Sequence, residues 1–386
     1  MEPEIRHHET AEAAEGLPHA ETTLTPEPPA APEPWETRAV RRVFLGNRGL
    51  RTGWAAALFI VLFLILMGVV GFLFYQLHLV SQKSDFSAQA AFFSELMLFL
   101  ALVGAGAAVA LAERRSFWDY NLRGPNPTLH FVSGLVAGFV ALSALIGVLA
   151  WGGWMRFGPI ALTGMAILKF GALWGAAFLL VGCVEEGTCR CFLLSILTRG
   201  INFWWALGTV GAICLELLLT AKGNGIWGVY GVALLGLGPC LALHVKKAEG
   251  SGFWQASWVT STLFGFVHTG NGGENWIGIF AAAAIGFVFC VSVRVTGSAW
   301  WAIGCHASWD WAETYFYGAA DSGNVATGHY MTTSPVGNVF WSGGSDGPEG
   351  SVLVLAVIVA LMAVVVAVYG RGKTEPAVAA VGQLAG

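Results

Sequence analysis

The chain has 386 residues, of which 55% are hydrophobic and only 11% charged, and its formal net charge is −4 at pH 7. A soluble protein carries roughly a quarter charged residues, so this chain lacks the polar surface of a water-soluble globule. The composition indicates a membrane protein and excludes a disordered, fibrous or nucleic-acid-binding one. The 17 Trp, 25 Phe and 51 Gly agree with this, because aromatic side chains favour bilayer interfaces and Gly lets membrane helices approach closely.

The first 36 residues differ sharply from the rest of the chain. They hold nine of the 24 acidic residues and seven of the 14 prolines, and they lack apolar periodicity. Such a segment cannot bury enough apolar surface to offset the entropy of ordering. We therefore predict a disordered cytoplasmic tail over residues 1–36.

Ten apolar segments are candidate membrane helices, which need about 20 mostly apolar residues. Seven are simple spans, over residues 54–77, 88–111, 129–151, 203–220, 226–245, 275–293 and 352–369. The stretch 160–197 is longer and is interrupted by charged residues, and the segments 253–268 and 298–317 are shorter and more polar. The sequence predicts an all-α, polytopic transmembrane bundle of about 8–10 helices.

Basic residues indicate how the bundle is oriented, because Lys and Arg accumulate in short cytoplasmic loops. They precede the first predicted span and recur in every second loop after it: Arg38, Arg41, Arg42, Arg48, Arg51, Arg114, Arg115, Arg123, Arg199, Lys246, Lys247, Arg294, Arg371 and Lys373. The opposite loops hold only Lys83, Arg156 and Lys222. We expect a multi-pass protein of the cell membrane, plasma or inner, with both termini cytoplasmic.

Ionisable side chains inside a bilayer are costly, so each is a candidate functional residue. In the stretch 160–197, Glu186 and Arg190 are four residues apart and share a helix face, which predicts an ion pair. Glu185 lies about 100° around the helix from Glu186, so it stays available as a general base. A purely structural ion network of all three residues is the alternative.

Two further patterns carry histidines. His268 follows Phe264 at a spacing of four, near a predicted helix end, where a lone His is commonly a packing residue. His306 and Asp310 are also four residues apart and share a helix face. Asp310 could orient the imidazole, both side chains could point into one cavity, or the two could form a local packing pair.

Together, the three patterns have the chemistry for peptide hydrolysis within a membrane. Two histidines and a carboxylate on separate helices could deprotonate a water and stabilise the oxyanion, with or without a metal. The sequence contains no HExxH zinc motif and no GxGD aspartyl motif.

In this order, the three patterns resemble the signature of the CPBP family, the CAAX-protease and bacteriocin-processing intramembrane proteases also called Abi proteins. That signature is EExxxR, FxxxH and HxxxN or HxxxD, and the chain has EEGTCR, FGFVH and HASWD. The resemblance implies a bundle of about eight helices with the site in an intramembrane cavity.

The resemblance also implies residue roles. Glu185 would be the general base, with Glu186 and Arg190 as its supporting pair. His268 would help to bind the water or a metal, and His306 with Asp310 would complete the site. A zinc ion held by Glu185, His268 and His306 is possible, and the sequence leaves metal use open.

Two departures from the family pattern concern the spacing and the third motif. Glu185 and His268 are 83 residues apart, where many members have roughly half that, so the helices within 203–245 look like an inserted pair. The third motif ends in Asp310, and a carboxylate donates no hydrogen bond unless it is protonated.

The expected organisation follows the motifs. N-terminal transmembrane helices occupy 37–121, a CPBP-like catalytic core 122–320, a polar extracytoplasmic loop 321–351, and the last membrane helix with a short cytoplasmic tail 352–386. We expect an intramembrane endopeptidase that contacts membrane lipids and cleaves a membrane-associated peptide or protein. The alternative is a non-catalytic immunity or scaffold protein, or an ion-coupled transporter, with the same fold. The oligomeric state stays open.

Overall fold

The computed structural model describes residues 43–46, 49–80, 86–220 and 225–370. By its internal contacts the chain divides into residues 1–43 and 44–386, and the fold given below is that of the second unit. The predicted tail over residues 1–36 and the predicted C-terminal tail after residue 370 lie outside the described residues.

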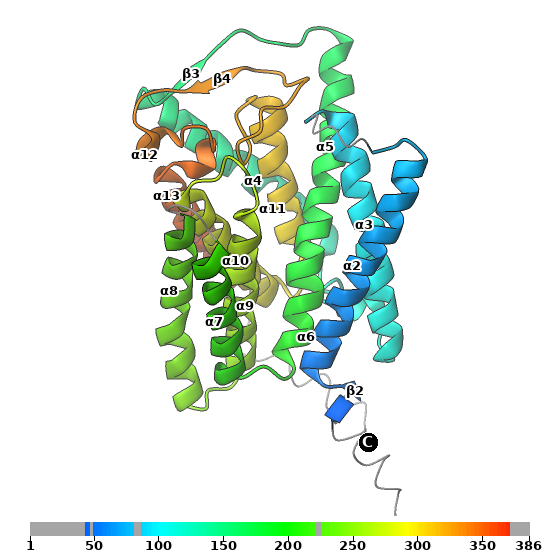
Figure 1. Ribbon diagram of the computed structural model, residues 1–386. Coiled ribbons are helices and arrows are strands. Elements are labelled where there is room, and N and C mark those ends of the chain that lie inside the picture. The colour runs from blue at the N-terminus through cyan, green and yellow to red at the C-terminus, as the bar shows by residue number, and fades with distance from the viewer. Residues whose placement is uncertain (1–42, 47–48, 81–85, 221–224, 371–386) are drawn as a thin grey trace, which may run out of the picture. The chain divides into compact units, whose positions relative to one another are not determined.

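Ten helical segments of the described chain run along the bundle one after another (Figure 1). They are α2 (Thr52–Gln76), α3 (Ala88–Ala112), α4 (Pro127–Trp151), the continuous run of α5 (Met165–Glu186), η2 (Gly187–Leu193) and α6 (Leu194–Thr198), α7 (Phe203–Thr220), α8 (Gly225–Val245), α9 (Ser251–His268), α10 (Trp276–Thr296), α11 (Trp300–Asp310) with η3 (Trp311–Phe316), and α13 (Leu353–Tyr369). Each corresponds to one of the ten apolar segments in the sequence.

Seven helices within the described residues are long and apolar enough to cross a membrane. They are α2, α3, α4, the run from α5 to α6, α7, α8 and α10. The run from α5 to α6 has 34 residues, so the long apolar stretch of the sequence forms a single span. The chain is a multi-pass membrane protein, and the predicted polytopic helical bundle is confirmed.

The remaining elements are short. They are β1 (Leu45–Gly46) paired with β2 (Gly49–Leu50), η1 (Phe117–Asp119), β3 (Met155–Phe157) paired with β4 (Thr333–Pro335), α12 (Val339–Ser342) and η4 (Pro348–Gly350). Both pairs are antiparallel, and Met155 lies opposite Pro335. The β3–β4 pair ties the loop after η3 to the connection between α4 and α5, so the polar loop predicted over 321–351 forms an ordered cap.

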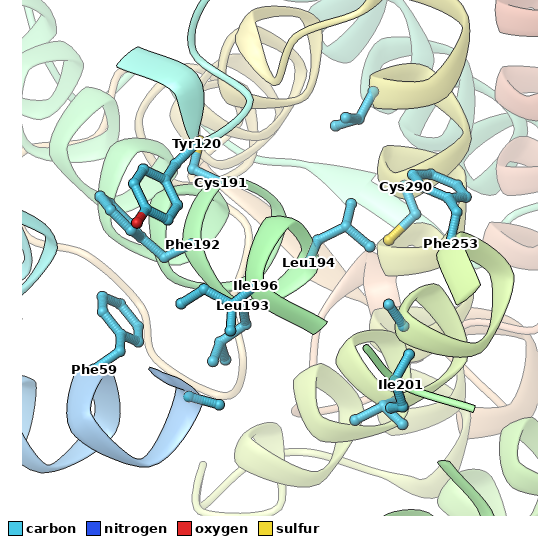
Figure 2. Packing of buried hydrophobic residues seen from close by; sticks show 14 of the residues in the cluster. Phe59, Tyr120, Cys191, Phe192, Leu193, Leu194, Ile196, Ile201, Phe253 and Cys290 are labelled. Atoms are coloured by element: carbon cyan, nitrogen blue, oxygen red, sulfur yellow. The ribbon is translucent and has the colours of Figure 1, made fainter. Parts of the chain in front are cut away.

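A buried hydrophobic cluster holds the end of the run from α5 to α6 in place (Figure 2). Phe192, in η2, stacks on Phe59 of α2 with ring centroids 5.0 Å apart, and its ring lies 4.9 Å from that of Tyr120. A Cβ atom on Gly106 of α3 would lie only 2.2 Å from the Phe192 ring. Only glycine therefore allows α3 to approach this ring so closely.

The helices α4 and α11 touch through their backbones. A Cβ atom on Gly134 would lie 2.2 Å from the carbonyl oxygen of Trp301, and one on Gly138 would lie 2.1 Å from that of Cys305. On the opposing face, Gly304 meets the carbonyl oxygen of Phe131 in the same way, at 2.3 Å. Small residues four apart permit such close packing of membrane helices. This contact sets the position of α11, which carries the third motif.

We expect Gly138→Ala to lower the free energy of unfolding by about 1–3 kcal/mol, because the added methyl group forces the two helices apart. Gly147→Ala is the matched control on the same helix, since nothing lies within 4 Å of its added Cβ. Thermal unfolding in detergent measures both variants. Equal stability of the two would contradict the packing role of Gly138.

Candidate active site

The first motif lies where the helix changes its geometry. Glu185 and Glu186 are the last residues of α5, and the chain continues without a break as the π-helix η2. Short π-helical segments within α-helices occur frequently at functional sites. Glu186 and Arg190 form the ion pair that their spacing predicts, with Nε and Oε2 3.2 Å apart and both side chains fully buried.

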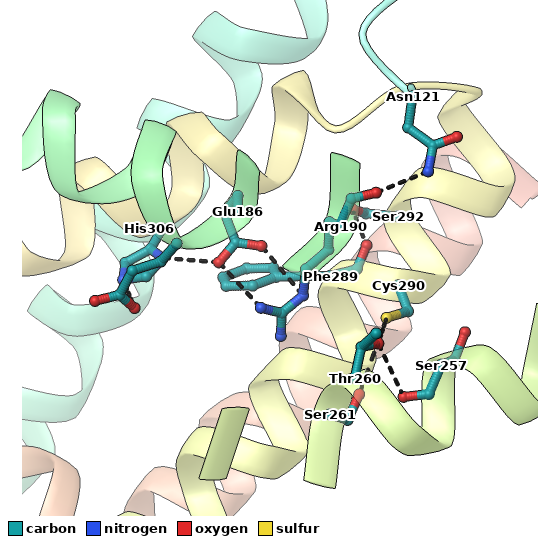
Figure 3. A network of polar contacts seen from close by, with 11 residues as sticks. Asn121, Glu186, Arg190, Ser257, Thr260, Ser261, Phe289, Cys290, Ser292 and His306 are labelled. Atoms are coloured by element: carbon teal, nitrogen blue, oxygen red, sulfur yellow. Dashed lines mark hydrogen bonds and ion pairs between the residues drawn. The ribbon is translucent and has the colours of Figure 1, made fainter. Parts of the chain in front are cut away.

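Arg190 is also enclosed by aromatic rings from two other helices. Its guanidinium carbon lies 4.3 Å from the ring centre of Phe264 in α9 and 5.6 Å from that of Phe289 in α10. The ring faces attract the cation and stabilise it where no water reaches. The backbone carbonyl of Arg190 accepts a hydrogen bond of 2.7 Å from Asn121 (Figure 3). The Phe of the second motif is therefore a partner of the Arg of the first.

His306 joins the third motif to the first. Its Nδ1 donates to Oε1 of Glu186 at 2.8 Å (Figure 3). Its Nε2 lies 3.7 Å from Oε2 of Glu185 and 3.5 Å from Oδ2 of Asp310. Because Glu186 occupies one ring nitrogen, the other must face Glu185 and Asp310. The sequence suggested Asp310 as the residue that orients the imidazole, but the shorter contact comes from Glu186.

His268 is the last residue of α9 and is half-buried. Its Nδ1 donates to the backbone carbonyl of Phe264 at 2.8 Å, so Nε2 is the nitrogen left for other partners. The Phe264 ring lies 4.7 Å from the His268 ring and 6.1 Å from the His306 ring. Phe264 thus contacts both histidines as well as Arg190.

Four of the six predicted site residues line one cavity of about 250 Å³: Glu185, His268, His306 and Asp310. The other two, Glu186 and Arg190, are fully buried and pair with each other beside the cavity. The three motifs therefore meet, with one carboxylate held in an ion pair and its neighbour facing the open space.

Three further carboxylates line the same cavity, and the motifs did not identify them. Glu95 comes from α3, while Asp321 and Glu349 come from the cap. Glu95 carries the signal of an ionisable residue within a predicted span. Asp321 and Glu349 lie in a polar loop, where acidic residues are ordinary, so the composition gives no signal for them.

The sequence predicts a metal site at Glu185, His268 and His306. Among the described residues, no group of three or more His, Cys, Asp or Glu side chains is arranged so that it could hold a metal ion. The Nδ1 of each histidine has a protein acceptor, which leaves Nε2 as the nitrogen that a metal would take. The metal site stays a prediction of the sequence, and the chemistry derived below uses none.

Part of the chain matches the model of a known protein family. Residues 167–312 match the model of a family described as Rce1-like, type II CAAX prenyl endopeptidase Rce1-like. The match covers less than half of the chain and contains all three motifs, and it confirms the resemblance to the CPBP family over this segment. No curated protein and no solved structure matches the chain significantly.

We expect Arg190→Met to lower the free energy of unfolding by about 3–5 kcal/mol, because it leaves the buried Glu186 carboxylate without its cation. The double variant Arg190→Met, Glu186→Gln should recover part of that loss, since it removes both charges. Denaturant titration of the purified variants in detergent measures this coupling. Additive losses would show that the ion pair does not hold the motifs together.

Proposed function

We propose that the chain is an intramembrane endopeptidase that hydrolyses a peptide bond in a membrane-associated peptide or protein. The family match over residues 167–312 supports CAAX-type protease activity. One observation carries the assignment of roles: Glu185, His268, His306 and Asp310 line one cavity, while Glu186 and Arg190 neutralise each other.

In the proposed reaction, Glu185 is the general base. A water between Glu185 and the scissile carbonyl gives its proton to the carboxylate while its oxygen attacks the carbonyl carbon. The tetrahedral intermediate then collapses, the C–N bond breaks, and Glu185 returns the proton to the departing amine. The contact of 3.7 Å between Glu185 and Nε2 of His306 supports a reacting oxygen close to both.

The negative oxygen of the intermediate needs donors aimed at it before the reaction begins. The Nε2 atoms of His268 and His306 take this role when both rings are protonated, because the hydrogen on Nδ1 is already donated to a protein acceptor and only an imidazolium carries a second one on Nε2. An ionised Asp310 has no hydrogen to donate. Asp310 therefore acts through His306, where its contact at 3.5 Å favours a proton on Nε2.

Glu185→Gln should abolish cleavage of a peptide library by the reconstituted protein, because an amide cannot accept the proton of water. Glu216→Gln is the matched control, since Glu216 is an exposed carboxylate on α7. A loss of about a thousandfold or more in kcat/KM is expected for the first variant, in line with removal of a catalytic group.

Cleavage that survives Glu185→Gln undiminished would contradict the proposal. Absence of cleavage by the wild-type protein would instead favour the non-catalytic and transporter alternatives, which account for the same buried charges. Uptake of an ion into proteoliposomes, abolished by Glu185→Gln, would identify the transporter.

We further propose that the protein lies in the cell membrane with both termini cytoplasmic. Arg199 directly follows the last residue of α6, and Lys246 and Lys247 follow α8. These positions lie at the end of the bundle opposite the β3–β4 pair (Figure 1). Lys and Arg gather on the cytoplasmic side of membrane proteins. The cap, with its acidic residues, would then face away from the cytoplasm.

A reporter fused after α13 tests this orientation. Green fluorescent protein fused there should fluoresce, because it matures in the cytoplasm, whereas alkaline phosphatase should be inactive there. The same reporters inserted at Gly337, in the cap, should give the opposite result. Phosphatase activity from the C-terminal fusion would overturn the orientation.

A further inference from the structure

The cavity is lined by more acidic side chains than basic ones. Of the described residues that line it, five are carboxylates, Glu95, Glu185, Asp310, Asp321 and Glu349, and none is Lys or Arg. Arg190 does not compensate them, because it is enclosed by aromatic rings and paired with Glu186. The basic side chains that the described part of the chain contributes to the wall are His268 and His306.

The two cap carboxylates, Asp321 and Glu349, both line the cavity and are close enough to interact electrostatically, and we call them the acidic end of the cavity. Behind it, Trp309 donates its single indole N–H to two carboxylates at once, to Oε1 of Glu349 at 2.6 Å and to Oε2 of Glu313 at 3.1 Å. Glu313 is fully buried, and its Oε1 has no hydrogen-bond partner among the described residues. One neutral donor therefore serves two adjacent acids.

A third acid, also in the cap, has a carboxylate oxygen without a hydrogen-bond partner among the described residues. Asp346 is fully buried, and its Oδ2 accepts from the backbone N–H of Asn275 at 3.1 Å, while its Oδ1 has no partner within the described chain. Burial, with the nearby Glu274 as a second cause, raises the pKa of Asp346 to about 8. Burial likewise raises the pKa values of Asp321 and Glu349 above their ordinary range. Within the described residues, no ion pair with a Lys or Arg stabilises the charged forms of these groups.

We infer that the cavity selects substrates that place a positively charged group, an ammonium or a guanidinium, at the acidic end beside Asp321 and Glu349. This rests on the proposed peptidase function and names the substrate class of the same site. The cation would compensate the acids of the cap, and the peptide attached to it would extend towards Glu185 and His306.

The observations favour an organic cation over a metal ion. No group of three acids, histidines or cysteines within the described residues is arranged to hold a metal. A guanidinium or ammonium spreads its donors over a larger volume and can bind carboxylates that are further apart. Two sources share this chemistry, a Lys or Arg side chain of the substrate and its free amino terminus.

The test uses the full chain with Glu185→Gln, so that bound peptide is not consumed. Short apolar peptides with blocked ends carry Lys, Arg, norleucine or Glu at each position in turn, and one further peptide keeps a free amino terminus. Fluorescence anisotropy in detergent measures their dissociation constants. We expect a cationic peptide to bind about tenfold more tightly than its norleucine counterpart, and the Glu peptide to bind more weakly.

Two variants test whether Glu349 and Asp321 cause the preference for cationic peptides. Glu349→Gln keeps an acceptor for Trp309, and Asp321→Asn keeps one for Thr314, which donates to Oδ2 of Asp321 at 2.8 Å. Each should reduce the ratio between Lys and norleucine peptides severalfold. Glu249→Gln removes a charge from an exposed position after α8 and should leave the ratio unchanged.

The outcomes separate the two proposals. Equal binding of Lys, norleucine and Glu peptides would overturn the charge selection, whether or not the wild-type protein cleaves them. Preferred binding of the free-amine peptide alone would assign the acidic end to a substrate amino terminus. Selective binding of cations without any cleavage would uphold the inference and contradict the peptidase.

Discussion

The buried carboxylate of Glu186 is the interaction on which the site depends. It accepts from Arg190 and from His306, and none of its surface reaches solvent. A charge in such a place persists only when its partners compensate the loss of water. These two partners lie on different helices, so the carboxylate fixes the first motif and α11 relative to each other. Phe264 adds α9 by covering the guanidinium.

This arrangement divides the ionisable groups of the site into two kinds. Glu186 and Arg190 compensate each other's charge, and in the proposed mechanism they support the site without taking part in the reaction. Glu185 stands next to Glu186 in the chain but faces the cavity, where its Oε2 lies 3.7 Å from Nε2 of His306. Preorganised groups of this kind need little rearrangement when charge develops in a reaction. Adjacent residues point about 100° apart on a helix. For this reason Glu186 lies in the buried ion pair while Glu185 faces the cavity.

The helices and much of the site follow from local sequence patterns. The ten apolar segments appear as ten helices, because span length and hydropathy are properties of continuous segments. The pairing of Glu186 with Arg190 follows from a spacing of four. The bond from Glu186 to His306 does not, because the two residues are 120 positions apart and no periodicity connects them. Glu349 cannot be predicted from the sequence for a similar reason. It lies in a loop, and it reaches the cavity only because the β3–β4 pair holds the cap over it.

The π-helix η2 restricts the ways in which this chain could change. It begins directly after Glu186 and contains Phe192, whose ring is anchored between α2, α3 and Tyr120. A regular α-helix turns about 100° per residue, and a wider π turn alters the phase between the two ends of the segment. This altered rotation lets the Glu186 carboxylate face α11 while Phe192 faces α2 and α3. Loss of a single residue from η2 would therefore rotate one anchor away from its partners, so the length of this segment is as constrained as the identity of its charged residues.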